Sequence, residues 1–194
     1  MPENNSIKIS TTAPAALYIT GCICLAIFAL LTAQVPGNAI PVLVVWTTAA
    51  GIGIIVCGIL EVVRNNATLG VIILVSGTLL AWGAGMGFNA SRLLPVEIWE
   101  KGLQMCGYVW LGIGISMWMT LVVAAKVSWG MFISQFILGA SSLLLAWGLI
   151  SRIGFGDGIV NIAGWVILVY AIYSFYTATA MLANSVYGRK VLPV

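Results

Sequence analysis

The sequence predicts an all-α fold, a polytopic membrane bundle of six transmembrane helices, and the placement of charge is the main reason. Only 7% of the 194 residues are charged and 61% are hydrophobic, whereas soluble domains average about 25% charged residues. Long stretches contain no Asp, Glu, Lys or Arg, and they cover residues 9–60, 65–91, 102–125, 127–151 and 158–188. Because a bilayer core excludes charge and one crossing needs about 20 apolar residues, these stretches are typical of membrane spans.

Turn signals divide the uncharged stretches into six candidate helices. These run approximately over Ala15–Gln34, Ile40–Val62, Leu69–Gly87, Gln104–Ala125, Trp129–Ile150 and Ile159–Asn184. Pro14 and Pro41 stand near helix starts, where proline is tolerated because the first N–H groups of a helix have no partner. The run Val35–Asn38 contains Pro and Gly and marks the first turn, and the glycine-rich run Arg152–Asp157 marks the last.

Residues 1–194 form a single domain in this interpretation, since no hydrophilic stretch is long enough for a second one. Residues 1–13 are then an N-terminal segment and residues 185–194 a C-terminal tail. An even number of spans puts both termini on one side, which would hold Lys8, Arg64, Lys126, Arg189 and Lys190. The opposite loops would hold Arg92, Lys101 and Arg152. The positive-inside rule therefore predicts cytoplasmic termini, and we expect the plasma membrane as the location.

The longest predicted connection runs from Asn89 to Leu103. Glu97 and Lys101 are four residues apart within it, as in an exposed helical ion pair, and Trp99 suits the headgroup region. This pattern predicts a short helix lying at the membrane interface. An extracellular lid over a pore is the alternative interpretation.

The residue types present favour no enzyme class. The chain has no histidine, which removes the usual general base at neutral pH and the commonest metal ligand. Its four cysteines fall in or beside apolar spans and are expected to be free packing thiols. Glu61 and Asp157 lie near helix ends and are interpreted as boundary charges. We therefore expect no catalytic residues, metal or cofactor, and the scattered basic residues predict no nucleic-acid partner.

The same absence of charge constrains transport. Proton-coupled carriers usually place ionisable relays inside the bundle, and no such residue is predicted inside these spans. A solute would cross passively or carry its own proton, as a neutral weak acid does. A bare carboxylate in an apolar constriction would cost several kcal/mol unless hydrogen-bond donors replaced its water. Uncharged donors do occur within the spans, and most are expected to make ordinary hydrogen bonds within or between helices. They are Thr20, Thr47, Thr48, Ser76, Thr78, Ser116, Thr120, Ser134, Gln135, Ser141, Ser142, Asn161, Ser174, Thr177, Thr179 and Asn184.

Glycines are spaced regularly on two of the predicted helices. Gly51 and Gly58 are seven residues apart on the second span, and Gly70 and Gly77 are seven apart on the third. This spacing puts each pair on one stripe and predicts close approach of two backbones. The alternative is that the glycines leave room for a solute.

Two segments carry a resemblance to a known family. The C-terminal half contains Ala163-Gly164-Trp165 and later Tyr187-Gly188-Arg189-Lys190-Val191-Leu192-Pro193. The end of the second span reads Gly58-Ile59-Leu60-Glu61, followed by Asn66 and Thr68-Leu69-Gly70. These motifs resemble those of the acetate uptake transporter family, whose bacterial type is the succinate–acetate permease. Of that family's Asn-Pro-Ala-Pro-Leu-Gly-Leu signature, this chain keeps Ala13, Pro14 and Leu17.

The resemblance implies a homohexamer of six-helix subunits in a lipid bilayer, each with its own path for acetate or a related small carboxylate. The family's narrow gate consists of Phe, Tyr and Leu. The corresponding positions here are Thr20, then Ser76 or Gly77, and the retained Leu138, while a polar glutamine of the second span becomes Ile54. Replacement of two aromatics by small residues implies a wider or rearranged constriction.

Two further functions remain open at this point. One is a passive pore for a small neutral solute such as ammonia, urea or an amide. It would share the architecture, but its flux would not depend on the protonation of an acid. The other is a non-transporting accessory membrane subunit that kept the fold after its gate changed. For the leading interpretation, a channel or transporter for a small monocarboxylate, succinate is a further candidate solute.

Overall fold

Six apolar segments of 19 to 30 residues each form helical spans long enough to cross a bilayer. A computed structural model describes residues 11–193, apart from the side chains at 82–84, 92, 96, 97, 99, 100 and 127. Lys8 and the rest of the first ten residues lie outside the described part, as does the side chain of Glu97. The prediction of a six-span all-α membrane protein is confirmed.

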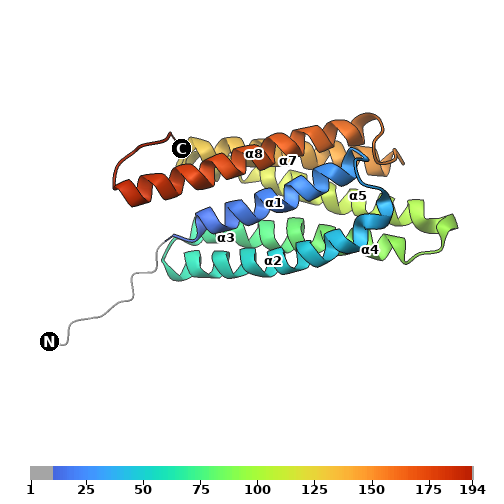
Figure 1. The fold of residues 1–194 in the computed structure, drawn as a ribbon, viewed down its shortest axis with the longest axis horizontal. Helices are drawn as coiled ribbons and strands as arrows, with labels where there is room; N and C mark the ends of the chain where they lie inside the picture. Colours follow the sequence, from blue (N-terminus) through green and yellow to red (C-terminus); the bar gives the residue numbers. More distant parts are fainter. Residues whose placement is uncertain (1–10, 194) are drawn as a thin grey trace.

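The spans follow the chain in order (Figure 1). The first is α1 (Ala13–Leu31), and the second is α2 (Ile40–Val63) with a short 3-10 turn, η1 (Gly37–Ala39), before it. The third consists of α3 (Ala67–Val75), η2 (Ser76–Gly83) and α4 (Ala84–Arg92), and the fourth of α5 (Val96–Met119) and α6 (Leu121–Val127). The fifth and sixth are α7 (Trp129–Ile150) and α8 (Gly158–Tyr187).

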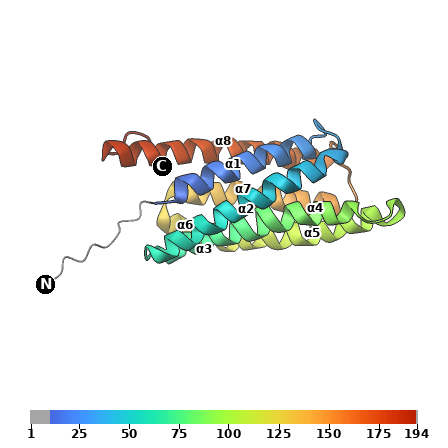
Figure 2. The same ribbon diagram turned by 60° about the horizontal axis from the view of Figure 1, so that its bottom comes forward.

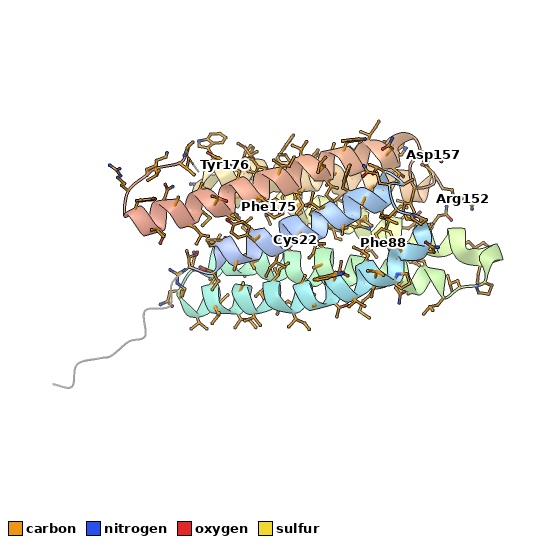
Figure 3. All side chains as sticks on the ribbon, in the orientation of Figure 1. Cys22, Phe88, Arg152, Asp157, Phe175 and Tyr176 are labelled. Atoms are coloured by element: carbon orange, nitrogen blue, oxygen red, sulfur yellow. The ribbon has the colours of Figure 1, made fainter. Side chains whose placement is uncertain are left out.

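Helix contacts close these spans into a ring. Each span packs against the next along the chain, and α8 returns to pack along α1. Figures 1 and 2 show α1 beginning and α8 ending at the same end of the bundle. In Figure 3, Arg152 and Asp157 lie at the opposite end, so these charged side chains sit outside the apolar length of the helices.

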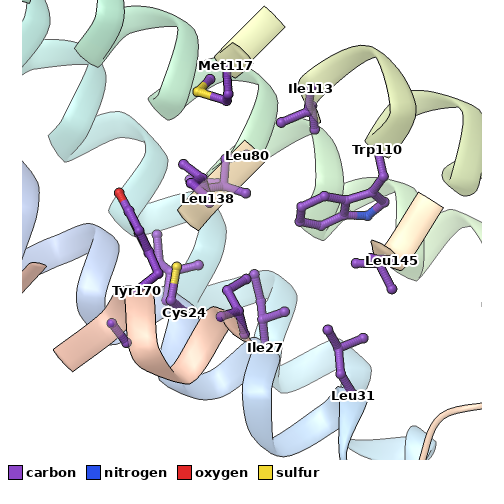
Figure 4. Packing of buried hydrophobic residues seen from close by; sticks show 14 of the residues in the cluster. Cys24, Ile27, Leu31, Leu80, Trp110, Ile113, Met117, Leu138, Leu145 and Tyr170 are labelled. Atoms are coloured by element: carbon purple, nitrogen blue, oxygen red, sulfur yellow. The ribbon is translucent and has the colours of Figure 1, made fainter. Parts of the chain in front are cut away.

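The interior of the ring is packed with apolar side chains. Leu80, Trp110, Ile113, Leu138 and Leu145 are each no more than 1% exposed, and Figure 4 shows them gathered between the helices. The outer surface is apolar as well, as the exposed side chains of Val45, Trp46, Val122 and Trp147 illustrate. Apolar side chains on both faces match a bundle surrounded by lipid, which solvates them as well as a protein core does.

The main differences from the predicted helices lie in the third and fourth spans. The segment after Pro95 is the start of α5 and continues to Met119, so the prediction of a separate interfacial helix was wrong. No helix-breaking residue stands between Val96 and Gln104 except Gly102, and one glycine rarely ends a helix. The third span is interrupted by a π-helical stretch at Ser76–Gly83, and the fourth breaks at Thr120.

The predicted close approach of glycines is confirmed between α2 and α3. A Cβ atom added at Gly58 would lie 3.0 Å from the Gly70 carbonyl oxygen, and one added at Gly70 would lie 2.8 Å from the Gly58 oxygen. Real Cβ contacts are rarely this short, so only glycine allows the two backbones to touch here. The contact holds α3 against α2 shortly before the π-helical stretch begins at Ser76.

Candidate functional site

A small cavity with a mainly apolar lining and a few polar groups lies inside the ring, toward the end of the bundle where α1 begins and α8 ends. Its volume is about 30 Å³, which is room for about two water molecules. Residues from α1, α2, α3, η2, α7 and α8 line it, and all of them are uncharged. They are Ala13, Ala16, Leu17, Thr20, Ile54, Leu69, Ile72, Ile73, Ser76, Met131, Ser134, Gln135 and Tyr170.

Several residues singled out from the sequence meet at this cavity. Thr20 and Ser76 line it from facing helices, and Ala13 and Leu17 line it from the first turns of α1. Gly77 does not, because a Cβ atom there would point at Ile54 of α2, 3.0 Å from its Cγ2 atom. The sequence offered Ser76 or Gly77 for the position of the family's gate tyrosine. Of these two residues, Ser76 is the one that lines the cavity.

Leu138 lies beyond the cavity wall, in the packed core. It is 0% exposed, and Figure 4 shows it beside Leu80, between Tyr170 and Met117. Its carbonyl oxygen accepts hydrogen bonds from Ser141 at 2.9 Å and Ser142 at 2.8 Å. Leu138 is therefore a residue of the packed apolar core and does not line the cavity.

The polar groups around the cavity differ in their hydrogen bonding. Thr20 Oγ1 donates to the Ala16 carbonyl at 2.8 Å, and Ser76 Oγ donates to the Ile72 carbonyl at 2.9 Å. On the opposite wall, Ser134 Oγ and Gln135 Oε1 are buried and have no hydrogen-bond partner. The walls formed by α1 and η2 can therefore only accept a hydrogen bond, whereas α7 offers groups that are still available.

Tyr170 was not singled out from the sequence. It projects from α8, lines the cavity and is 4% exposed. Its hydroxyl lies near Ser134 and Ser174. A possible signal was the spacing of Tyr170, Ser174 and Thr177, which puts three hydroxyl groups on one face of a single helix.

Ser76 also marks a change in helix geometry. The π-helical stretch that begins there has wider turns than an α-helix, and such turns often occur at functional sites. Ser76 is the one residue that belongs both to this stretch and to the cavity lining. The local widening therefore starts at the cavity wall.

Glu61 is fully buried, which corrects its interpretation as a boundary charge. Its carboxylate accepts hydrogen bonds from the Thr12 backbone N–H at 2.6 Å and from Thr11 Oγ1 at 2.9 Å. Arg64 forms a salt bridge to it at 2.9 Å and is itself 28% exposed. Burial is tolerated because an opposite charge and several donors surround the carboxylate. Glu61 holds the start of α1 and does not line the cavity.

The remaining family-motif residues have structural contacts. Pro14 is buried in the first turn of α1. Trp165 is 53% exposed and packs edge-on against Phe28, with ring centroids 5.1 Å apart. The C-terminal tail folds back on α8, where Asn184 bonds to Val191 and Leu192, and the Tyr176 hydroxyl donates to the Pro193 carbonyl at 3.0 Å.

Metal-ligating side chains do not gather anywhere in residues 11–193: no group of three or more His, Cys, Asp or Glu residues occurs there. All four cysteines are free. Three of them are buried, as expected for packing thiols, whereas Cys22 is exposed on the outer face of α1. The chemistry available at the cavity is therefore hydrogen bonding and apolar contact.

Comparison with known proteins gives a match among the solved structures. No family model matches the chain, and no curated protein matches it. Among solved structures, the bacterial acetate channel SatP matches with a TM-score of 0.77 at 22% sequence identity. The match covers 96% of this chain and 99% of that chain. The chain is therefore an integral membrane protein whose six-span helical bundle has the same fold as this channel.

Proposed function

We propose that the protein is a membrane channel or transporter for acetate or another small monocarboxylate, with succinate as a further candidate, and that it belongs to the acetate uptake transporter family. The observation that carries the proposal is the near-full-length match in fold to an acetate channel. The cavity supports it, because Thr20 and Ser76, at the family's gate positions, meet there. A passage role also suits a site with no charged or metal-ligating lining residue.

The cavity is suited to the neutral form of an acid. The Thr20 and Ser76 hydroxyl groups already donate hydrogen bonds to carbonyls of their own helices. Both hydroxyl groups therefore present lone pairs to a solute. Gln135 Oε1 is a further acceptor without a donor. Beside Thr20 and Ser76 a carboxylate would meet lone pairs, whereas a protonated acid brings an O–H group. We infer that the solute crosses with its proton.

The apolar part of the lining fits a short alkyl group. Ile54, Ile72 and Ile73 face the cavity from α2 and α3, across from the polar groups of α7. A volume of about 30 Å³ is too small for a whole acetic acid molecule together with its hydration. Binding therefore requires the cavity to widen, and Met131, which has a flexible side chain, lies in its wall.

The proposal includes the assembly and the location implied by the family. Subunits would form a homohexamer in the plasma membrane, each with its own path, and both termini would face the cytoplasm. The two ends of the described chain lie at one end of the bundle, as this arrangement requires. Lys126 and Arg64 also lie at that end, at the ends of their spans, where the positive-inside rule expects basic residues.

Flux into liposomes tests the proposed function. Vesicles containing the purified protein should take up labelled acetate faster than empty vesicles, and the excess should grow as the pH falls toward the pKa of the acid. Urea measured in the same vesicles identifies the second candidate, a pore for neutral solutes, because the uncharged lining with an open acceptor also suits N–H donors. Urea flux without acetate flux would favour that pore, and no flux of either solute would favour an accessory subunit.

A further inference from the structure

Hydroxyl groups inside the spans fall into two classes. Most of them donate to a carbonyl of their own helix, as Thr20, Ser76, Ser116, Ser141 and Ser142 do at 2.8 to 2.9 Å. This local bond is the usual solution for Ser and Thr in lipid-embedded helices. Ser134, Ser174 and Thr177 do not make it, and their oxygens are buried without any hydrogen-bond partner.

These exceptional groups lie together where α7 meets α8. Ser134, Gln135, Tyr170, Ser174 and Thr177 make up this α7–α8 polar cluster, and each is at most 4% exposed. On α8, Tyr170, Ser174 and Thr177 follow the i, i+4, i+7 spacing of one helix face. The Tyr170 hydroxyl lies near both Ser134 and Ser174, without a hydrogen bond of good geometry to either of them.

Part of the cluster opens onto the cavity. Ser134, Gln135 and Tyr170 are lining residues, whereas Ser174 and Thr177 lie behind them. A buried polar group without a partner is costly, and such groups in native proteins usually receive a partner from water or a ligand. The open positions are of two kinds: the Ser134 hydroxyl can donate or accept, and Gln135 Oε1 can only accept.

Counting donors separates the possible solutes. An unsubstituted short acid in its neutral form brings one O–H donor, which its carboxyl group carries. Thr20 and Ser76 offer lone pairs on one wall of the cavity, and Ser134 and Gln135 offer a hydroxyl and an acceptor oxygen on the other, so one O–H group cannot bond at both walls. A 2-hydroxy acid brings a second donor on the neighbouring carbon atom. Sites built to bond a substrate hydroxyl discriminate strongly against analogues that lack it.

We infer that Ser134, Gln135 and Tyr170 form a subsite for the hydroxyl group of a short 2-hydroxy acid such as glycolic acid. The inference rests on the proposed function, because it assumes that a small acid reaches the cavity. The carboxyl group then lies toward Thr20 and Ser76, and the 2-hydroxyl group lies between Ser134 and Gln135.

Comparison of two acids of equal size tests this subsite. Propionic acid has a methyl group where glycolic acid has its hydroxyl, so their flux ratio isolates the hydroxyl. Both are measured as labelled acids in liposomes at equal concentrations of the neutral form, with the flux into empty vesicles subtracted. For the unaltered protein we expect a glycolic-to-propionic ratio above one. Gln135→Leu and Ser134→Ala should each lower this ratio about tenfold, the effect of one lost hydrogen bond in a closed site.

A matched control is Ser141→Ala, on the same helix. Its hydroxyl is bonded to the Leu138 carbonyl and it does not line the cavity, so this change should leave the ratio as it is. Acid flux with a ratio that neither variant lowers would overturn the subsite and leave the proposed function standing. Absence of flux for acetic, propionic and glycolic acids alike would overturn both. If Gln135→Leu does not fold, Gln135→Met and Ser134→Ala supply the same readout.

Discussion

The Glu61 carboxylate and the Thr12 backbone N–H form a 2.6 Å hydrogen bond that joins the last turns of α2 to the first turn of α1. The first N–H groups of a helix lack partners within it, and here the partner comes from a residue 49 positions away. Thr12 Oγ1 adds a bond to the Cys57 carbonyl at 2.9 Å. Because Ala13 and Leu17 line the cavity just beyond, this junction sets the position of the cavity wall.

Removal of the Glu61 carboxylate should destabilise the bundle. Glu61→Ala loses the bonds to Thr11 and Thr12 and the ion pair with Arg64, and hydrogen bonds to a charged group are worth about 1.5–3 kcal/mol each. We expect a loss of about 3 kcal/mol or more, seen as a lower thermal midpoint in detergent. Asp157→Ala is the control, since Asp157 is exposed and should cost less than 1 kcal/mol. Equal midpoints for the two variants would contradict the role assigned to Glu61.

The glycine contact between α2 and α3 should tolerate no side chain. In Gly70→Ala the new methyl group would meet the Gly58 oxygen and the Val62 nitrogen, both backbone atoms, at 2.8 and 2.9 Å. Overpacking of this kind costs about 1–3 kcal/mol. Gly112→Ala is the matched control, because a Cβ atom there has nothing within 4 Å. We expect a lower thermal midpoint for the first variant and an unchanged or higher one for the second.

A tryptophan side chain at Thr20 should close the proposed path. Thr20 lines a cavity of about 30 Å³, and an indole group is larger than this space. We expect Thr20→Trp to reduce acetate flux in liposomes at least tenfold. Ile52→Trp, on the outer face of α2 with Ile52 54% exposed, adds the same ring to the lipid side. Retained flux in Thr20→Trp would mean that the solute travels elsewhere.

Opposite substitutions at Leu138 should move the flux in opposite directions. Leu138 stands at a proposed gate position and is 0% exposed in the apolar core. Leu138→Ala opens space there and should raise acetate flux, at a stability cost of about 2–5 kcal/mol. Leu138→Trp should lower the flux. The acetate flux of each variant is divided by the amount of folded protein. If neither variant changes this flux, the constriction lies at another residue.

The bonds from Asn184 should protect the C-terminal tail. Its side chain bonds to the Val191 N–H at 2.6 Å, to the Leu192 N–H at 3.0 Å and to the Leu192 carbonyl at 2.8 Å. In Asn184→Ala we expect trypsin to cleave after Arg189 and Lys190 several times faster than in the unaltered protein. Asn161→Ala, in the first turn of α8, serves as the control. Identical cleavage rates in the two variants would show that the tail is held by other contacts.

The sequence was sufficient to predict the fold because lipid imposes a simple rule on charge. All six spans were located, and most of their ends were found within a few residues. The boundaries that differed have local causes: α5 begins at Val96 because nothing before Gln104 stops a helix, and the π-helical stretch at Ser76 has no composition signal of its own.

The site was predicted less completely, for a different physical reason. In a lipid-facing bundle both faces of a helix are apolar, so the pattern does not tell which way a helix is turned. Thr20 and Ser76 came from the family resemblance, whereas Tyr170 could be placed only once α8 was packed against α7. Glu61 was interpreted as a boundary charge because it stands near the end of a span, but the residues at the start of α1 cover its carboxylate.

The uncharged lining of the cavity has an electrical consequence. A membrane voltage of 100 mV shifts the energy of a unit charge that crosses the bilayer by about 2.3 kcal/mol, and it exerts no such force on a neutral molecule. A protonated acid moving past Thr20, Ser76 and Gln135 would therefore carry no current. Uptake would follow the concentration gradient of the undissociated acid alone, and a cell could not accelerate it by polarising its membrane.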